Sequence, residues 1–115
     1  MRTYITNTIR QFIEDYARQQ SILEMWENPI VRFASAHDPL FRELKHIVGE
    51  SHETPKQLLV NAETVICYFI PFARSIPKSN KDNKVMASEE WASAYVETNK
   101  LIIALNDRIA SRLKE

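Results

Sequence analysis

The sequence contains very little glycine and cysteine, and each shortage excludes a class of functional site. Its single glycine, Gly49, cannot form a glycine-rich phosphate-binding loop. Its single cysteine, Cys67, excludes an internal disulfide and any zinc or iron–sulfur site built from several cysteines of this chain. The nucleophile-elbow motif, a serine between two nearby glycines, is excluded for the same reason.

Net charge and long apolar runs are also missing. Fifteen basic residues balance fifteen acidic ones, so no overall field attracts nucleic acid or an anionic membrane, although a local patch stays open. The longest apolar stretch, 65–72, is interrupted by Pro71 and is far shorter than the roughly 20 residues of a membrane helix. The N-terminus lacks the apolar core of a signal peptide. We expect a soluble, cytoplasmic protein with no membrane partner.

What the sequence does contain is helical periodicity at both ends. The length of 115 residues fits one domain, 1–115. In the helical N-terminal segment 1–27, Thr3 is the expected N-cap, and 21–26 is either a second short helix or irregular. In the C-terminal segment 88–115, Ser88 caps a long helix whose apolar face includes Trp91 and Tyr95. The apolar stripe of the first helix comprises Ile5, Ile9, Phe12, Ile13 and Tyr16.

Two strands are expected between these helices, at 30–36 and 64–70, because both segments are rich in β-branched and aromatic residues. Asp38 and Pro39 have the pattern of a helix start, and Gly49 lies where that helix would end. Thr54 and Pro55 begin a second short helix. A strand, a helical connection and a second strand predict a parallel βαβ-like unit over 29–72.

The second strand is a continuous apolar run, which is typical of a strand covered on both faces. Cys67 is therefore expected to be a buried, unreactive thiol. A two-stranded sheet is too small to be stable alone, so further strands are needed. The segment 84–86 is a poor candidate, and another chain or a C-terminal extension is the alternative. The predicted fold is α/β, with a small parallel or mixed sheet flanked by helices and a long C-terminal helix.

A polar loop, 73–87, follows the second strand. Ligands of open α/β sheets bind beyond the carboxyl ends of the strands, so we place a candidate ligand site there. The loop carries Arg74, Lys78, Lys81 and Lys84 against Asp82, which suits a phosphate or an RNA backbone, although a solvated loop would have the same composition. The candidate ligand-binding residues are His37, Phe72, Arg74, Lys78, Ser79 and Asn80.

Several segments match one family in order and spacing. They are Pro29-Ile30-Val31-Arg32-Phe33-Ala34, Asp38-Pro39-Leu40-Phe41, Leu58-Leu59-Val60-Asn61-Ala62-Glu63-Thr64-Val65-Ile66, Tyr68-Phe69-Ile70-Pro71-Phe72, Ser79-Asn80 and Ser88-Glu89-Glu90-Trp91-Ala92-Ser93-Ala94-Tyr95-Val96-Glu97-Thr98-Asn99. Together they resemble the N-terminal region of the epoxyqueuosine-reductase-like iron–sulfur proteins. The resemblance covers most of the chain from Pro29 onward and departs at Arg32, where relatives more often carry glycine.

The resemblance implies an oxidoreductase whose better-known members use two [4Fe–4S] clusters and a corrinoid to reduce a modified tRNA base. Each cluster needs four thiolates, and this chain has only Cys67, so it cannot hold the clusters. We expect the substrate- or cofactor-side N-terminal domain, not catalytic alone, as a truncated product, a split subunit or an excised domain. His37 would then be an acid–base group or a corrinoid contact, or else only part of a helix cap.

A second hypothesis belongs to a different class. An unpaired strand edge or an exposed apolar helix face could make the chain a non-catalytic interaction module that forms a homodimer. Balanced charge argues against general nucleic-acid binding and leaves only tRNA contact through 73–87. We assign no catalytic residue and no metal ligand, and we expect His46 and His52 to lie on the surface.

Overall fold

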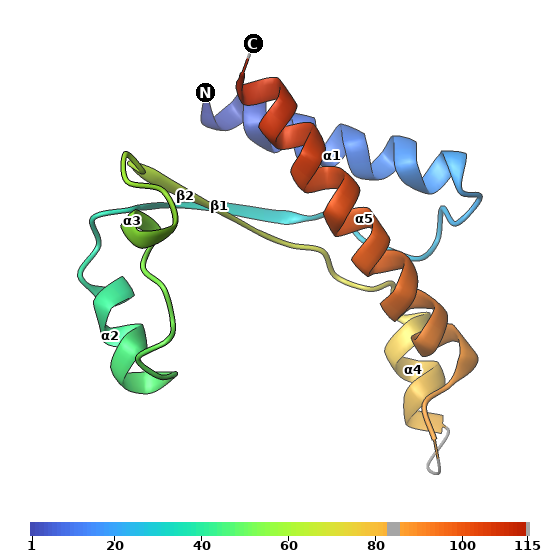
Figure 1. Cartoon of the computed structure of the whole chain (residues 1–115). Coiled ribbons are helices and arrows are strands. Elements are labelled where there is room, and N and C mark those ends of the chain that lie inside the picture. The colour runs from blue at the N-terminus through green and yellow to red at the C-terminus, as the bar shows by residue number, and fades with distance from the viewer. Residues whose placement is uncertain (83–85, 115) are drawn as a thin grey trace. The chain divides into compact units, whose positions relative to one another are not determined.

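The computed structural model describes residues 1–82 and 86–114, and it forms a mixed α/β protein. In chain order its elements are α1 (Arg2–Gln19), β1 (Ile30–Ser35), α2 (Leu40–Ile47), α3 (Pro55–Leu58), β2 (Thr64–Phe69), α4 (Ser75–Asp82) and α5 (Glu89–Leu113). The elements divide into two compact units (Figure 1). Unit 1 comprises residues 1–30 and 69–115, and unit 2 comprises residues 31–68.

Unit 1 is built around α5, the long C-terminal helix that the sequence predicts. Both α1 and α4 pack against α5 (Figure 1). The buried stripe of α1 is Ile5, Ile9, Ile13 and Ala17, which follows the predicted period but moves Phe12 and Tyr16 to its half-exposed flank. The buried residues that α5 contributes are Ala94, Leu101 and Leu105. This apolar contact between helices is the core of unit 1.

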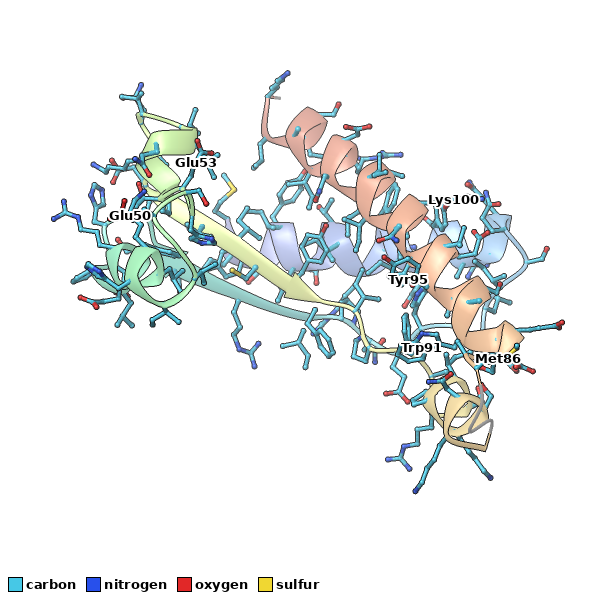
Figure 2. All side chains as sticks on the ribbon, turned by 60° about the horizontal axis from the view of Figure 1, so that its bottom comes forward. Glu50, Glu53, Met86, Trp91, Tyr95 and Lys100 are labelled. Carbon is cyan, nitrogen blue, oxygen red and sulfur yellow. The ribbon has the colours of Figure 1, made fainter. Side chains whose placement is uncertain are left out.

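Near the N-terminus of α5, the predicted core position of Tyr95 is wrong. Trp91 is half-buried and the Tyr95 side chain is 62% exposed (Figure 2). Ala94 is fully buried, so the buried stripe is rotated away from Tyr95 at this end of the helix. A helix this rich in apolar residues has more than one plausible stripe, and packing against α1 and α4 selects between them.

Two helix caps form as expected, and a third does not. Ser88 Oγ accepts a hydrogen bond from the Trp91 amide at 3.0 Å. The side chains of Thr54 and Gln57 form a reciprocal capping box at α3, with Pro55 in the first turn. Thr3, in contrast, lies inside α1, because the helix already begins at Arg2. Local capping chemistry therefore places the starts of α3 and α5 correctly and misplaces that of α1 by two residues.

The segment 21–26 is a turn and contains no second helix. Ser21 has a φ of +58°, a left-handed conformation that interrupts helical geometry after α1. The chain then pairs in an antiparallel bridge between Trp26 and Phe72. The buried Trp26 indole donates from Nε1 to Thr98 Oγ1 at 2.7 Å. This tryptophan therefore ties the turn to α5 within unit 1.

The sheet is a pair of antiparallel strands, β1 and β2, so the predicted parallel βαβ arrangement is wrong. The Ala36 amide donates to the Glu63 carbonyl at 2.8 Å, which brings the end of β1 beside the start of β2. The connection that contains α2 and α3 therefore closes a long hairpin. A helical connection makes a parallel crossover possible without requiring one.

The prediction that β2 is covered on both faces is also wrong. Cys67 is exposed, Phe69 at the strand end is 62% exposed, and Val65 and Ile66 are only half-buried. The thiol expected to be buried is therefore accessible to solvent. An apolar run indicates how much apolar surface a strand can bury. Whether that surface is buried depends on which other elements pack against the strand.

The predicted polar loop 73–87 contains a helix, α4, from Ser75 to Asp82. Pro77 does not prevent it, because a proline in a first turn removes an N–H that has no helical partner. Of the additional strand expected at 84–86, positions 84 and 85 lie outside the described residues, and Met86 is not in a strand. Among the residues described, no helix combines the length and hydrophobicity needed to cross a bilayer.

Candidate functional site

The six residues of the predicted ligand site fall in both units. His37 belongs to unit 2, whereas Phe72, Arg74, Lys78, Ser79 and Asn80 belong to unit 1. The site was expected at the carboxyl ends of two parallel strands, and antiparallel strands do not end at a common edge. Within unit 1, the Phe72 ring meets the Trp91 ring edge-on, with 5.4 Å between centroids, and so takes part in packing.

Ser79 and Asn80 contact the start of α5. Ser79 Oγ donates to the Ile76 carbonyl at 2.7 Å and lies 2.8 Å from Ser88 Oγ. Asn80 Oδ1 accepts a hydrogen bond from the Ser88 amide at 3.1 Å. Because Ser88 is buried and also caps α5, these bonds satisfy polar groups at the α4–α5 junction. The two side chains therefore have a structural role that their position in a predicted loop did not indicate.

Arg74, which directly precedes α4, and Lys78 and Lys81 of α4 form a row of exposed cations. Steps of four and three residues place side chains on one helix face, and the Lys78 amide donates to the Arg74 carbonyl at 3.3 Å. We call these three residues the basic row. Lys84, the fourth predicted cation, lies outside the described residues. The basic row is the part of the predicted site that could meet a phosphate-bearing ligand.

His37 lies just after β1 and contacts Glu63, which lies just before β2. Its Nε2 is 2.8 Å from Glu63 Oε2, and its amide donates to Ser35 Oγ at 3.1 Å. The hydrogen bond and the charge of His37 lower the pKa of the Glu63 carboxyl below its usual value. The N-cap of α2 is Pro39, not Asp38 as predicted, although Asp38 Oδ1 accepts from the Leu40 amide; His37 is therefore not the capping residue either.

The described residues do not provide the ligands of an iron–sulfur cluster. Cys67 can supply one thiolate, and a [4Fe–4S] cluster needs four. In the ranges 1–82 and 86–114, no three histidine, cysteine or acidic side chains gather in a way that could hold a metal ion. The donor set therefore does not fit the clusters that the family resemblance implies, and no chemical step is assigned to them in this chain.

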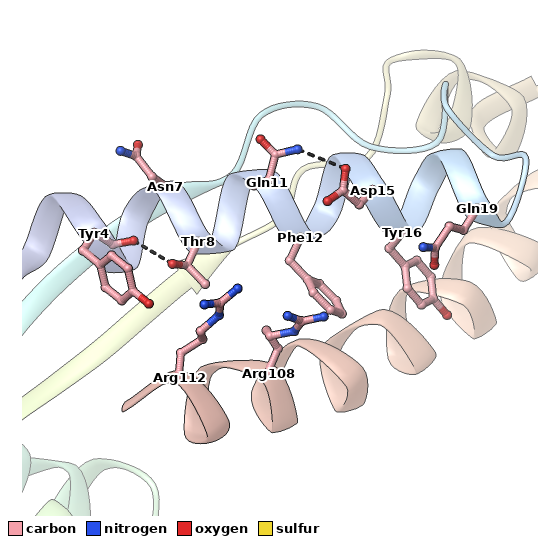
Figure 3. Close-up of a pocket in the computed structure, with 10 residues that line it drawn as sticks. All are labelled: Tyr4, Asn7, Thr8, Gln11, Phe12, Asp15, Tyr16, Gln19, Arg108 and Arg112. Carbon is pink, nitrogen blue, oxygen red and sulfur yellow. Dashed lines mark hydrogen bonds between the residues drawn. The ribbon is translucent and has the colours of Figure 1, made fainter. Parts of the chain in front are cut away.

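A groove between α1 and α5 is a feature that the sequence did not reveal. It has a volume of about 480 Å³ and lies within unit 1 (Figure 3). Phe12 and Tyr16 face it from α1, and Arg108 and Arg112 face it from α5 (Figure 3). The period of α1 placed both aromatic rings in the core stripe, and nothing in the pattern paired that helix with two arginines almost 100 positions away.

The chain matches no family model, no curated protein and no solved structure. Its function is therefore inferred from the contacts within each unit. Three features can be tested directly: the basic row, the contact between His37 and Glu63, and the exposed hairpin.

Proposed function

We propose that the chain corresponds to the substrate- or cofactor-side N-terminal domain of an epoxyqueuosine-reductase-like iron–sulfur oxidoreductase, and that it is not catalytic alone. The observation that carries this proposal is the exposure of β2. Its apolar residues belong to the segment that resembles the family, and β1 is its only strand neighbour among the described residues. An exposed apolar edge strand is an aggregation hazard unless something covers it.

In this proposal, a cluster-bearing segment or subunit packs on β1 and β2 and extends them into a larger, mixed sheet. The four-thiolate clusters and a cobalamin belong to that assembly, in the cytoplasm, where thiols stay reduced. This chain contributes binding surface and no electron-transfer group. The single cysteine of this chain, Cys67, is exposed on β2, which agrees with a chain that supplies a binding surface and leaves the cluster ligands to its partner.

The proposed assembly is tested most directly by the genome sequence around this gene. The reading frame after codon 115, or an adjacent gene, must encode Cys-x-x-Cys-x-x-Cys runs, each with a fourth cysteine elsewhere, since each [4Fe–4S] cluster needs four thiolates. A genome without such a sequence near this gene contradicts the proposal.

Cobalamin binding is tested by titrating the protein with cobalamin and recording its visible spectrum. If His37 contacts the corrinoid, His37→Gln removes the spectral change and His46→Gln, an exposed histidine of α2, keeps it. A spectrum that never changes contradicts a corrinoid site on this chain. A change that survives His37→Gln removes His37 from the site.

The basic row supports contact with a tRNA backbone on the substrate side. Its cations are exposed and on one face, so they can neutralise neighbouring phosphates and release counterions. The double variant Lys78→Gln/Lys81→Gln should weaken tRNA binding and reduce the slope of log affinity against log salt by about 2. The control, Arg42→Gln/Lys56→Gln, removes the same charge from exposed positions of unit 2. Equal losses in both variants, or affinity independent of salt, contradict a site at the basic row.

The exposed hairpin also favours the second candidate, a non-catalytic module that forms a homodimer. Here a second copy covers β2 instead of a cluster-bearing partner, by adding its strand edge. Sedimentation at micromolar concentration should then show a dimer, and thiol labelling of Cys67 should slow as protein concentration rises. A stable monomer with rapidly labelled Cys67 at all concentrations contradicts this candidate and leaves the first unaffected.

A further inference from the structure

The groove between α1 and α5 combines stacked aromatic rings with cations from the facing helix. The Phe12 and Tyr16 rings are stacked, with 6.1 Å between centroids and 27° between planes. The Arg108 guanidinium carbon lies 5.6 Å from the centre of the Phe12 ring. In Figure 3 the rings extend from α1 toward α5, and Arg108 extends from α5 toward α1. A planar apolar surface and a positive charge therefore share one space.

The Phe12 ring positions Arg108 without neutralising it. A cation–π contact is electrostatic and leaves the guanidinium its positive charge, and a guanidinium has five N–H donors for other partners. In the ranges that the structure describes, Arg108 forms no ion pair with a carboxylate. Its planar fork of donors matches the geometry of a carboxylate or a phosphate.

The charge of the groove is positive overall. Its lining contains Arg108 and Arg112 against one acidic residue, Asp15. Asp15 Oδ1 already accepts from Gln11 Nε2 at 3.0 Å and lies 3.6 Å from Arg18 Nη1. The acidic group is thus engaged along α1 itself, and among the described residues it forms no ion pair with Arg108.

We propose that this groove binds a small aromatic anion, a planar ring bearing a carboxylate or a phosphate. The ring lies against Phe12 and Tyr16, where offset or edge-on contact with aromatic rings is favourable. The anionic group accepts hydrogen bonds from the fork of Arg108. The volume of about 480 Å³ lies within the range typical of small-molecule sites.

Heteronuclear NMR titration of the full chain tests the proposal with three probes that share one ring system. They are 2-naphthoate, 2-naphthyl phosphate and the neutral 2-naphthamide. Saturable shifts at millimolar concentration are expected with an anion, centred on residues 12, 16 and 108. The neutral amide should bind about tenfold or more weakly, because it lacks the charge that Arg108 recognises. Preference for one anion identifies the group as a carboxylate or a phosphate.

Two variants of Arg108 separate the effect of its planar set of N–H donors from the effect of its positive charge. Arg108→Gln should weaken binding of the preferred anion about tenfold, whereas Arg108→Lys, which keeps the charge and loses the fork, should fall between that variant and the wild type. Arg42→Gln, an exposed arginine of unit 2, should bind like the wild type. Each variant must keep the unliganded wild-type spectrum away from its substitution. Equal binding of the neutral amide, unchanged affinity in Arg108→Gln, or shifts confined to other residues would overturn the proposal.

Discussion

The two units differ sharply in how much apolar surface they bury. In unit 1, Ile9 of α1 and Leu101 and Leu105 of α5 are fully buried, and the two helices pack against each other. In unit 2, all of whose residues are described, the buried apolar side chains are Val31 and Ala36. Several larger apolar side chains of unit 2 are exposed instead: Leu40, Ile47, Val48, Leu58, Leu59 and Val60.

This difference indicates where the fold of the isolated chain is self-sufficient. Burial of apolar area is the main favourable term in folding, so unit 1 has its own source of stability. Unit 2 relies on one pair of strands and short helices, and an isolated hairpin is marginally stable in water. Unit 2 is therefore the part of the chain that leaves most apolar surface available to a partner.

The largest difference between the two units is expected for a matched pair of leucine-to-alanine substitutions. Leu101→Ala in unit 1 should reduce the free energy of unfolding by about 2–5 kcal/mol, because the side chain is 0% exposed and its removal leaves a cavity. Leu58→Ala in unit 2 should change it by no more than about 0.5 kcal/mol, because that side chain is 70% exposed. Urea unfolding followed by circular dichroism measures both. Similar losses would show that unit 2 is packed as tightly as unit 1.

A polar contact in unit 1 should have the next largest effect. Thr98→Val keeps the side-chain shape but leaves the buried Trp26 indole N–H without its acceptor, at a cost of about 1–3 kcal/mol. Thr8→Val removes a hydroxyl that donates only to the Tyr4 carbonyl on the surface of α1, so it should cost at most about 0.5 kcal/mol. Thermal unfolding of both variants measures the difference. If Thr98→Val is as mild as Thr8→Val, the contact between Trp26 and Thr98 does not hold the turn to α5.

In both units, the sequence predicts helix periods and caps better than it predicts which segments pack together. The period of α1 and the caps at Ser88 and Thr54 are local signals, and the helices follow them. The helix α4 was missed because polar residues and Pro77 resemble a loop, although a first-turn proline is compatible with a helix.

The direction of strand pairing, the exposure of Cys67 and the groove beside Arg108 could not be predicted, since each depends on which distant segments meet. The contacts of the predicted ligand-site residues could not be predicted from the sequence for the same reason. Ser79 and Asn80 are polar residues near a strand end, and only the fold shows that they bond to Ser88.

Loss of the cap at Ser88 tests this junction and should have a smaller effect. Ser88→Ala removes the acceptor of the Trp91 amide and the partner of Ser79 Oγ, and should cost about 0.5–2 kcal/mol. Ser93→Ala, at an exposed position of the same helix, should be neutral or slightly stabilising, because alanine is the better helix former. Urea unfolding compares the two variants. Equal stability would mean that the α4–α5 junction does not depend on this serine.

The smallest expected effect is the acid response of unit 2, where the contact between His37 and Glu63 joins the two strand ends. The hydrogen bond and charge of His37 lower the pKa of Glu63 in the folded chain below its usual 4.5. A depressed carboxyl pKa stabilises the fold above the unfolded-state value, and that contribution is lost as the pH falls through the folded-state value. His37→Gln should therefore raise the pKa of Glu63 toward 4.5, as followed by NMR titration of its side-chain carboxyl, while His46→Gln should leave it unchanged. If the pKa of Glu63 stays low in His37→Gln, then this contact does not hold the strand ends, and the pairing of the Ala36 amide with the Glu63 carbonyl is what closes the hairpin.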